Sequence, residues 1–496
     1  MKTELFATEI AHIMSPEFAL LHKHRTPDVN APLRCFAGHK FHFTGIGGVG
    51  MSGLAKLLIR NHATVSGSDL HASSVTDSLA AGGASITIGH SETCIPAGTE
   101  AVVISAAIKE ENPELMHARS NGIRVLKYAQ MLGLLMDCYT GIAVCGTHGK
   151  STTTGWIAWL LMKAGLDPSF VVGAEIPQCG TSSGPGSGRH FVAEACEFDR
   201  SFLNLHPHIG VILNIESDHL DYYRDEAEIV EAFGQFVRGV KPDGIIIANG
   251  EDANVAKATA CLPAGVRLIT FGMGEGCDFH AANIEVVDGL HHFDVYHGEE
   301  CLGRTRISLA GRHNVCNALA VVATCTSAGA SPAWILNNLD TFTGMDRRCM
   351  FKAKISGITV LDDYAHHPTE IRASLQGIRQ RYKPERIFCV FQPHQYSRTR
   401  FLLDDFAKSF TLADVTVVPE IYFVRDSEQN RQLVNSKLLV EKVRNNGCEA
   451  VFADSFVAIC QYLKENVSSG DLVVTMGAGD IWKVADEYIR WLGRDS

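Results

Sequence analysis

Two glycine-rich turns have residue types that could bind phosphate groups. In the first, "GIAVCGTHGKSTTTGWIAWLL", a Gly-Lys-Ser turn stands between a β-rich run and a helical run. Turn amides, a lysine and a hydroxyl for Mg²⁺ together make a triphosphate cradle, although a strict Walker A motif would need glycine where this chain has Val144. The residues predicted to bind the triphosphate are Gly146, Thr147, His148, Gly149, Lys150, Ser151 and Thr152. The alternative is an ordinary strand-to-helix turn with a solvated lysine.

The second turn, "FHFTGIGGVGMSG", lies earlier in the chain. Gly45, Gly47 and Gly50 form a G-x-G-x-x-G pattern that includes Gly48, and Asp69 follows nineteen residues after the last glycine. Such a turn lets backbone N–H groups meet a pyrophosphate at a helix N-terminus, while the acid reaches a ribose hydroxyl. The pattern predicts a dinucleotide-type fold without specifying NAD, because any nucleoside diphosphate carries a pyrophosphate. The alternative is a tight turn with no ligand.

Acidic residues follow the two strand-like runs after the Gly-Lys-Ser turn. "HFVAEACEFDRSF" contributes Glu194 and Glu197, and "ILNIESDHLDYY" contributes Asp218, His219 and Asp221. A magnesium site beside a phosphate loop needs an acid at a neighbouring strand end, and Mg²⁺ prefers oxygen ligands. The spacing alone leaves open whether these are metal ligands or only polar residues at strand ends.

Further polar side chains cluster at expected strand or helix ends in the second half of the chain. They are His313, Asn314, Asn317, Arg347, Arg348, Asp362, Asp363, Tyr364, His366, His367, His394, Arg398 and Arg400. Open α/β sheets bind ligands at the carboxyl ends of their strands, which favours a binding site. Asparagine near a helix start is more often a cap, and an exposed basic pair is usually only solvated.

Composition excludes several classes of protein. A net charge of −11 argues against a general nucleic-acid binder, and the 15 cysteines contain no C-x-x-C pair, which favours buried free thiols over a zinc module or disulfide framework. The first residues lack a signal-peptide core, and no run approaches the ~18 apolar residues of a membrane span. We expect a cytoplasmic protein with no nucleic-acid or membrane partner, a monomer or a weak homodimer.

The elements that must position these residues alternate between strand-like and helix-like runs. Three such cycles open near "FHFTGIG", "GIAVCGTHGK" and "GITVLDDYAHH", and this rhythm predicts three consecutive α/β domains with parallel sheets. We expect an N-terminal extension over 1–36 and domains over 37–138, 139–344 and 345–496. The turn-rich stretch "CGTSSGPGSGRH" is predicted to be a surface connection.

The motifs, in this order and spacing, resemble one known family. "FTGIGGVGMSG", "VSGSDL", "GTHGKSTTT", "EACEFDRSFLNLHP", "NIESDHLDYY", "GRHNVCNALA", "DDYAHHPTEI" and "FQPHQYSRTR" resemble the Mur ligases over roughly residues 38–490. Within that family they are most similar to the members that use UDP-N-acetylmuramate and L-alanine. The resemblance implies a Rossmann-like UDP-sugar-binding domain, a P-loop ATPase-like central domain and a Rossmann-like C-terminal domain that binds the amino acid.

The resemblance also implies roles for individual residues. The UDP-sugar would be bound by Gly45, Gly47, Gly48, Gly50 and Asp69, and the metal by Ser151, Glu194 and His219. Beyond the phosphate loop, ATP would be bound by His313, Asn314, Asn317, Arg347 and Asp363. The amino acid would be bound by Tyr364, His366, Gln395 and Arg398. The implied catalytic residues are Lys150, Glu194, His219, His366 and Arg398.

The implied reaction is ATP-dependent amide formation with Mg²⁺, as two ions. The lactyl carboxylate of UDP-N-acetylmuramate would attack ATP to give an acyl phosphate, which the amine of L-alanine would then attack. The chain departs from the family's usual residues at Ser151 (threonine), Cys196 (aspartate), Phe198 (serine) and Gln395 (arginine).

Other functions remain as alternatives to this reaction. Within the family, the alternatives are a murein-peptide ligase and a folylpolyglutamate-type ligase. Outside it, they are an NAD-dependent dehydrogenase and a non-enzymatic P-loop switch.

Overall fold

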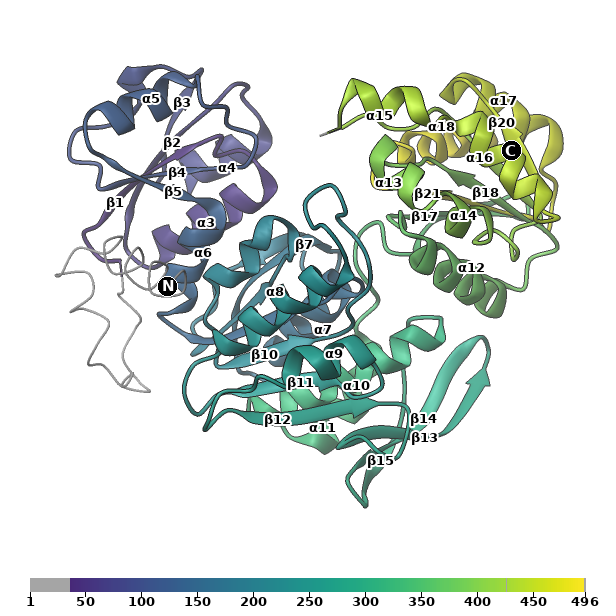
Figure 1. The fold of residues 1–496 in the computed structure, drawn as a ribbon, viewed down its shortest axis with the longest axis horizontal. Coiled ribbons are helices and arrows are strands. Elements are labelled where there is room, and N and C mark those ends of the chain that lie inside the picture. The colour runs from purple at the N-terminus through teal and green to yellow at the C-terminus, as the bar shows by residue number, and fades with distance from the viewer. Residues whose placement is uncertain (1–35, 425, 495–496) are drawn as a thin grey trace.

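The computed structural model describes residues 36–424 and 426–494, so the predicted extension lies, apart from Phe36, outside the described residues. Three α/β domains follow one another along the chain, each built on its own sheet (Figure 1). The predicted fold class is therefore confirmed.

The N-terminal domain has a parallel five-stranded sheet in the order β3-β2-β1-β4-β5. Its elements are β1 (Lys40–Thr44), α3 (Val49–Arg60), β2 (Thr64–Asp69), α4 (Ser74–Ala81), β3 (Ser85–Ile88), the 3₁₀ helix η1 (Glu92–Cys94), β4 (Ala101–Ile104), α5 (Pro113–Ser120), β5 (Arg124–Lys127) and α6 (Tyr128–Met136). Strand β1 pairs with both β2 and β4, so the strand order reverses there. The glycine turn after β1 therefore opens at the position where such sheets bind ligands.

The central domain has ten strands in the order β15-β14-β13-β12-β11-β10-β6-β9-β7-β8. Its elements are β6 (Thr140–Cys145), α7 (Lys150–Lys163), β7 (Ser169–Ile176), β8 (Thr181–Gly184), β9 (His190–Glu194), η2 (Phe198–Asn204), β10 (Ile209–Ile212), α8 (Glu226–Arg238), β11 (Ile245–Asn249), α9 (Ala253–Thr259), β12 (Arg267–Gly272), β13 (Phe279–Val287), β14 (Leu290–His297), β15 (Glu300–Arg306), α10 (Arg312–Ser327), α11 (Pro332–Asn338) and η3 (Leu339–Thr341). Parallel pairing from β7 to β13 forms the middle of the sheet, and antiparallel pairs flank it.

One of these antiparallel pairs corrects a prediction. Strand β8 lies inside the stretch predicted as a surface connection and pairs with β7, with Phe170 opposite Gly184. A Cβ on Gly184 would come within 2.6 Å of the Phe170 ring, so the small residue that suggested a loop instead permits close strand packing.

The C-terminal domain has six strands in the order β16-β17-β21-β18-β19-β20, with only β16 antiparallel to its neighbour. Its elements are β16 (Met350–Ile355), β17 (Ile358–Asp363), α12 (Pro368–Tyr382), β18 (Ile387–Phe391), α13 (Tyr396–Phe401), α14 (Leu403–Ala407), β19 (Val415–Val418), α15 (Glu428–Leu433), α16 (Ser436–Asn445), β20 (Glu449–Phe452), α17 (Phe456–Asn466), β21 (Leu472–Met476) and α18 (Trp482–Leu492). Helix α12 lies on the side that faces the central domain and contacts α10 (Figure 1).

The two domain junctions differ in character. Buried side chains of the N-terminal domain, of α6 and of one face of the central sheet form one continuous apolar core. The C-terminal domain has separate apolar cores on the two faces of its sheet. Its contacts with the central domain include the hydrogen bonds between polar side chains described below.

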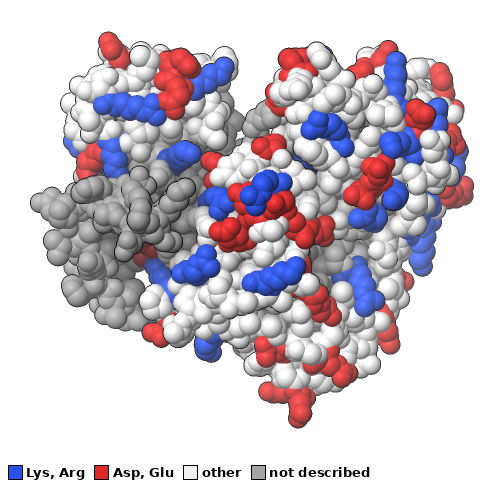
Figure 2. Space-filling view, in the orientation of Figure 1, with Lys and Arg blue, Asp and Glu red and all other residues white. Residues whose placement is uncertain are grey.

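The distribution of charged side chains on the surface is consistent with the net negative charge of the chain. Acidic and basic side chains are interspersed over the face shown in Figure 2, without an extended basic patch. None of the helices within residues 36–424 and 426–494 has the length and apolar character needed to cross a membrane.

Candidate active site

The phosphate loop joins β6 to α7 and needs glycine at both ends. Gly146 has φ 142° and Gly149 has φ 82°, which a residue with a Cβ adopts only with strain. Lys150 begins α7 and folds back over the loop, where its Nζ donates to the carbonyl oxygens of Gly146 (2.6 Å) and Thr147 (3.1 Å). The ammonium also donates to the Glu197 carboxylate at 2.9 Å. All three donors of this lysine are therefore occupied within the protein.

Glu197 controls the charge of this lysine. Burial alone would lower the pKa of Lys150, but the adjacent Glu197 carboxylate raises it above its ordinary value. Glu197 is itself buried, at 3% exposure. In the sequence, Glu197 was only one of several candidate acids at expected strand ends. Its pairing with Lys150 is visible only in the structure.

Glu194 and Ser151 line a different space, a cleft of about 560 Å³ to which all three domains contribute. Glu194 ends β9, and one of its carboxylate oxygens accepts a hydrogen bond from the Gly173 N–H at 2.8 Å. A serine hydroxyl and a carboxylate facing one cleft are the oxygen donors that Mg²⁺ prefers. These two residues therefore fit the predicted metal site, and their role as ligands stays a prediction.

His219 lies beside Glu197. Its Nε2 is 3.7 Å from a Glu197 carboxylate oxygen, and its backbone has φ 52°. It does not line the cleft that Ser151 and Glu194 share. Its role as a metal ligand also stays a prediction.

Among the described residues, one group of three meets the geometry of a metal site: His148, Glu216 and His367. Both ring nitrogens of His367 already have backbone partners, the Thr369 N–H and the Ser217 carbonyl oxygen, each at 3.3 Å. A metal bound there would displace at least one of these hydrogen bonds. We therefore interpret the group as an ion-pair cluster between domains.

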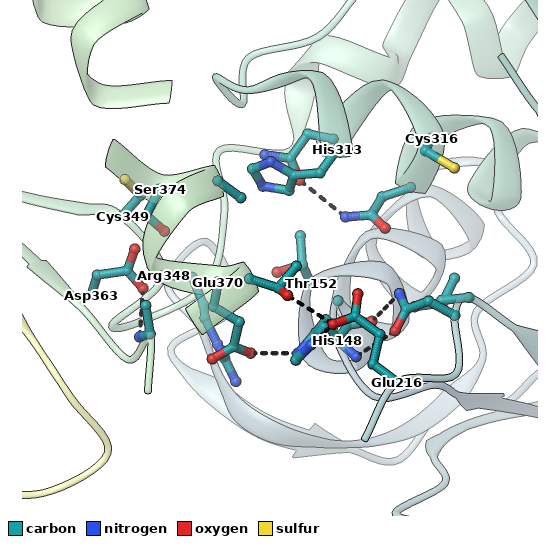
Figure 3. A pocket seen from close by; sticks show the side chains of 18 of the residues that line it. His148, Thr152, Glu216, His313, Cys316, Arg348, Cys349, Asp363, Glu370 and Ser374 are labelled. Atoms are coloured by element: carbon teal, nitrogen blue, oxygen red, sulfur yellow. Dashed lines mark hydrogen bonds and ion pairs between the residues drawn. The ribbon is translucent and has the colours of Figure 1, made fainter. Parts of the chain in front are cut away.

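A second cavity, of about 280 Å³, lies between the central and C-terminal domains (Figure 3). The predicted ATP-binding residues that line it are His148, Gly149, Thr152, His313, Asn314, Asn317 and Asp363. A Cβ on Gly149 would come within 3.0 Å of the Asn317 amide oxygen, so this glycine allows α10 to approach the phosphate loop. The structure thus brings four further ATP-binding candidates, His313, Asn314, Asn317 and Asp363, together with the phosphate loop.

Two titratable groups that line this cavity have shifted pKa values. The pKa of His313 is lowered to about 4, so its ring is neutral at pH 7. The pKa of Asp363 is raised to about 6, mainly by burial and despite nearby donors such as Ser374 and Arg348. At pH 7 His313 is therefore neutral, whereas Asp363 is still mostly ionised and becomes protonated as pH falls through about 6.

The role of Arg347 in ATP binding stays a prediction. Its guanidinium donates to Asp362 (2.9 Å) and to the Gly477 carbonyl oxygen (2.8 Å), and Arg348 rather than Arg347 lines the nucleotide cavity. Arg347 and Arg348 both line the three-domain cleft with Tyr364, so Arg348 borders both spaces. Both arginines were candidate binding residues in the sequence, but only the structure shows which space each side chain lines.

Most of the amino-acid candidates lie at the same domain junction. Arg398 is buried, and its Nε and Nη2 donate to one oxygen of Asp218 in the central domain, at 3.0 and 2.9 Å. Burial lowers the pKa of His366 to about 4. Gln395 is buried with φ 69° at the start of α13. Binding of an amino acid by these residues stays a prediction, and in this structure Arg398 joins two domains.

The glycine turn of the N-terminal domain is held by the predicted acid. The Gly47 N–H donates to Asp69 Oδ2 at 2.8 Å, and a Cβ on Gly50 would lie 3.1 Å from the Tyr128 ring. Asp69 therefore shapes the turn directly, and its other carboxylate oxygen, which accepts a hydrogen bond from the His71 N–H at 3.4 Å, keeps acceptor capacity for the predicted contact with a ribose.

Sequence analysis did not single out three residues at the central–C-terminal junction. They are Glu216, Thr369 and Glu370, and all three line the nucleotide cavity. The available signal was an acid in the first turn of a helix directly after "YAHHPT".

Comparison with known proteins gives one family match for each of the three domains. Models of the Mur ligase family match residues 40–140 (catalytic domain), 144–325 (middle domain) and 347–479 (glutamate ligase domain). The UDP-N-acetylmuramate–L-alanine ligase of Acetivibrio thermocellus is 42% identical over 452 residues, covering 90% of this chain and 95% of that protein. The ligase of that name from Clostridium novyi is also 42% identical, covering 91% and 97%.

Solved structures agree with these relatives. The UDP-N-acetylmuramate–alanine ligase of Thermotoga maritima superposes with a TM-score of 0.75 at 27% identity, covering 92% of this chain and all of that one. A murein peptide ligase from Psychrobacter arcticus gives a TM-score of 0.67 at 26% identity, covering 92% and 99%. The chain belongs to the Mur ligase family.

Proposed function

We propose that this protein joins L-alanine to the lactyl carboxylate of UDP-N-acetylmuramate, using ATP and releasing ADP and phosphate, as a step in peptidoglycan precursor synthesis. The observation that carries the proposal is the three-domain cleft, in which Ser151 and Glu194 face α3 of the N-terminal domain and Tyr364 of the C-terminal domain. Substrates held by separate domains would meet there. The names of relatives at 42% identity support the choice of sugar nucleotide and amino acid.

In the first step, a lactyl carboxylate oxygen attacks the γ-phosphorus of ATP, and the bond to the β-phosphate oxygen breaks to release ADP. Lys150 is suited to neutralise charge on the transferring group, because its raised pKa keeps it protonated. All three of its donors have protein partners, so contact with a phosphate requires that at least one be released. Gly146 and Gly149 leave room for the phosphates close to the backbone.

In the second step, the neutral amine of alanine attacks the carbonyl carbon of the acyl phosphate. The tetrahedral intermediate collapses with loss of phosphate, and the amine nitrogen gives up a proton. His366 is our candidate to accept that proton, because burial keeps its ring neutral at pH 7; its pKa near 4 makes it a weak base in the free protein, so bound substrate must raise that pKa before the ring can hold the proton. Closure of the C-terminal domain would exclude water from the acyl phosphate.

Mg²⁺ fits the donors in this cleft. We propose Ser151 and Glu194 as ligands, with His219 as the ligand of a second ion, and when bound the metal would neutralise charge on the phosphates. The number of ions, the cytoplasmic location and a monomeric or weakly dimeric state also remain proposals.

The test is product formation from purified protein with ATP, Mg²⁺ and UDP-N-acetylmuramate, adding alanine, serine or glycine in turn. We expect ADP release to depend on both the sugar nucleotide and the amino acid, with alanine the preferred substrate. Faster reaction with a murein peptide than with alanine would instead support the activity named for the Psychrobacter arcticus structure. ATP hydrolysis without any amide product would overturn the proposal.

A further inference from the structure

A single carboxylate connects the phosphate loop with the loop that leads into α12. Glu370 lies in the first turn of α12, and its Oε1 is 3.2 Å from Nδ1 of His148 in the phosphate loop of the other domain (Figure 3). Its Oε2 accepts a hydrogen bond from the backbone N–H of His366 at 3.0 Å and lies 3.3 Å from Nδ1 of that residue. The two oxygens thus contact two separate parts of the site.

A second carboxylate completes the junction around His148. Glu216 lies 3.5 Å from His148 Nε2 and accepts a hydrogen bond from the Thr369 hydroxyl at 2.7 Å. Burial by itself would lower the pKa of His148, but the hydrogen bonds to Glu216 and Glu370 raise it to about 9. The side chains of His148 and Glu370 are only 12% and 14% exposed. The attraction between this charged histidine and Glu216 lies within the central domain, whereas its contact with Glu370, also shielded from water, forms only when the two domains meet.

We propose that Glu370 is a positioning residue that couples ATP binding to amino-acid binding by linking His148 of the phosphate loop to the Tyr364–His367 loop. This inference rests on the proposed function, since it takes the His366 loop as part of the alanine pocket. ATP bound on the phosphate loop would orient His148, and through Glu370 it would hold the His366 loop in place for alanine. Because such coupling is reciprocal, alanine would strengthen ATP binding by the same factor.

Helix α12 offers a matched control at its opposite end. There the Arg381 guanidinium donates to the carbonyl oxygen of Asp288 at 2.6 Å, which also joins the C-terminal domain to the central domain. Arg381 does not line the nucleotide cavity or the three-domain cleft. If any contact across the junction were sufficient for coupling, Arg381→Ala would act like a change at Glu370.

The experiment measures binding of a non-hydrolysable ATP analogue by calorimetry, with UDP-N-acetylmuramate present, with and without saturating L-alanine. In the unmodified protein we expect alanine to tighten the analogue at least ~5-fold. Glu370→Gln, which preserves the side-chain volume, should reduce that factor to below about 2, and Arg381→Ala should preserve it. His148→Asn tests the same link from the other domain, and the double variant should lose no more coupling than either single one.

Three results would overturn the inference: full coupling in Glu370→Gln and in His148→Asn, equal loss in Arg381→Ala, or no coupling in the unmodified protein. If Glu370→Gln does not fold, His148→Asn decides the question alone. Amide formation by the unmodified protein is measured separately. Its absence would refute the proposed function, whereas amide formation with coupling intact in the variants would refute only the role of Glu370.

Discussion

Glu197→Gln should destabilise the protein without ATP and should do so much less with ATP bound. The change leaves the ammonium of Lys150, which is buried in the phosphate loop, without its carboxylate partner at 2.9 Å. Removing one partner of a buried ion pair costs roughly 3–5 kcal/mol. Lys150 keeps two carbonyl acceptors, Gly146 and Thr147, so we expect the lower end, about 3 kcal/mol.

This free energy corresponds to a measurable change in melting temperature. At about 2–4 °C per kcal/mol for a domain of this size, the central domain should melt roughly 6–12 °C lower. The raised pKa of Lys150 means that the contribution is complete at pH 7 and is lost only as pH rises above the ordinary value of 10.5. A non-hydrolysable ATP analogue with Mg²⁺ should restore much of the loss, because its phosphates give the lysine a new counter-charge.

The assay is a thermal melt with and without the analogue, with Glu194→Gln as the matched control. Glu194 accepts a backbone hydrogen bond from Gly173 and is not one of the three acceptors of Lys150, so its replacement should lower the melting temperature by little. Glu194→Gln should instead abolish Mg²⁺-dependent turnover. Equal melting temperatures for the two variants, or a Glu197→Gln deficit that the analogue does not reduce, would refute the reasoning.

Gly50→Ala should weaken UDP-sugar binding several-fold in calorimetry and leave ATP binding unchanged. The reason is that a Cβ 3.1 Å from the Tyr128 ring forces the turn or the ring to move. A loss of affinity confined to ATP would contradict the assignment of the two loops. Binding of ATP should weaken as pH falls through about 6, because Asp363 becomes protonated there and loses acceptor capacity. Asp363→Asn should abolish this pH dependence of ATP binding. An unchanged pH profile in the variant would exclude Asp363 as the source of the dependence. Gln395→Arg should lower the KM for alanine about tenfold, or about 1.4 kcal/mol, with little change in the KM for ATP. The reason is that arginine adds a charged donor for the carboxylate of alanine. An unchanged or higher KM for alanine would indicate that another cation such as Arg398 already binds that carboxylate.

Features that depend on local chemistry could be predicted from the sequence alone. A Gly-Lys-Ser turn after a β-rich run requires positive φ and a helix start, and both are present at Gly149 and α7. The glycine turn after β1 is equally local, because its backbone angles and its approach to Asp69 follow from a strand, a tight turn and a helix in succession. Alternating strands and helices likewise determined three α/β domains.

The antiparallel edges of the central sheet needed the tertiary structure. Strands β13, β14 and β15 were not predicted, although their sequences carry the Asp288-Gly289 turn that is typical of a hairpin. Strand β8 was predicted to be part of a loop because its residues are small and turn-forming. Pairing with a neighbouring strand outweighed these local preferences, as is common for edge strands.

The tertiary structure also decided how charged groups are paired. Glu197 lies 47 residues from Lys150, and Glu370 lies 222 residues from His148, so no local pattern reports either contact. The same holds for Arg347 and Arg348, which both line the three-domain cleft, although only Arg348 also borders the second cavity. Residue types show which groups are able to ionise or bind phosphate, whereas burial and the approach of distant segments determine which partner each group has and how far its pKa moves.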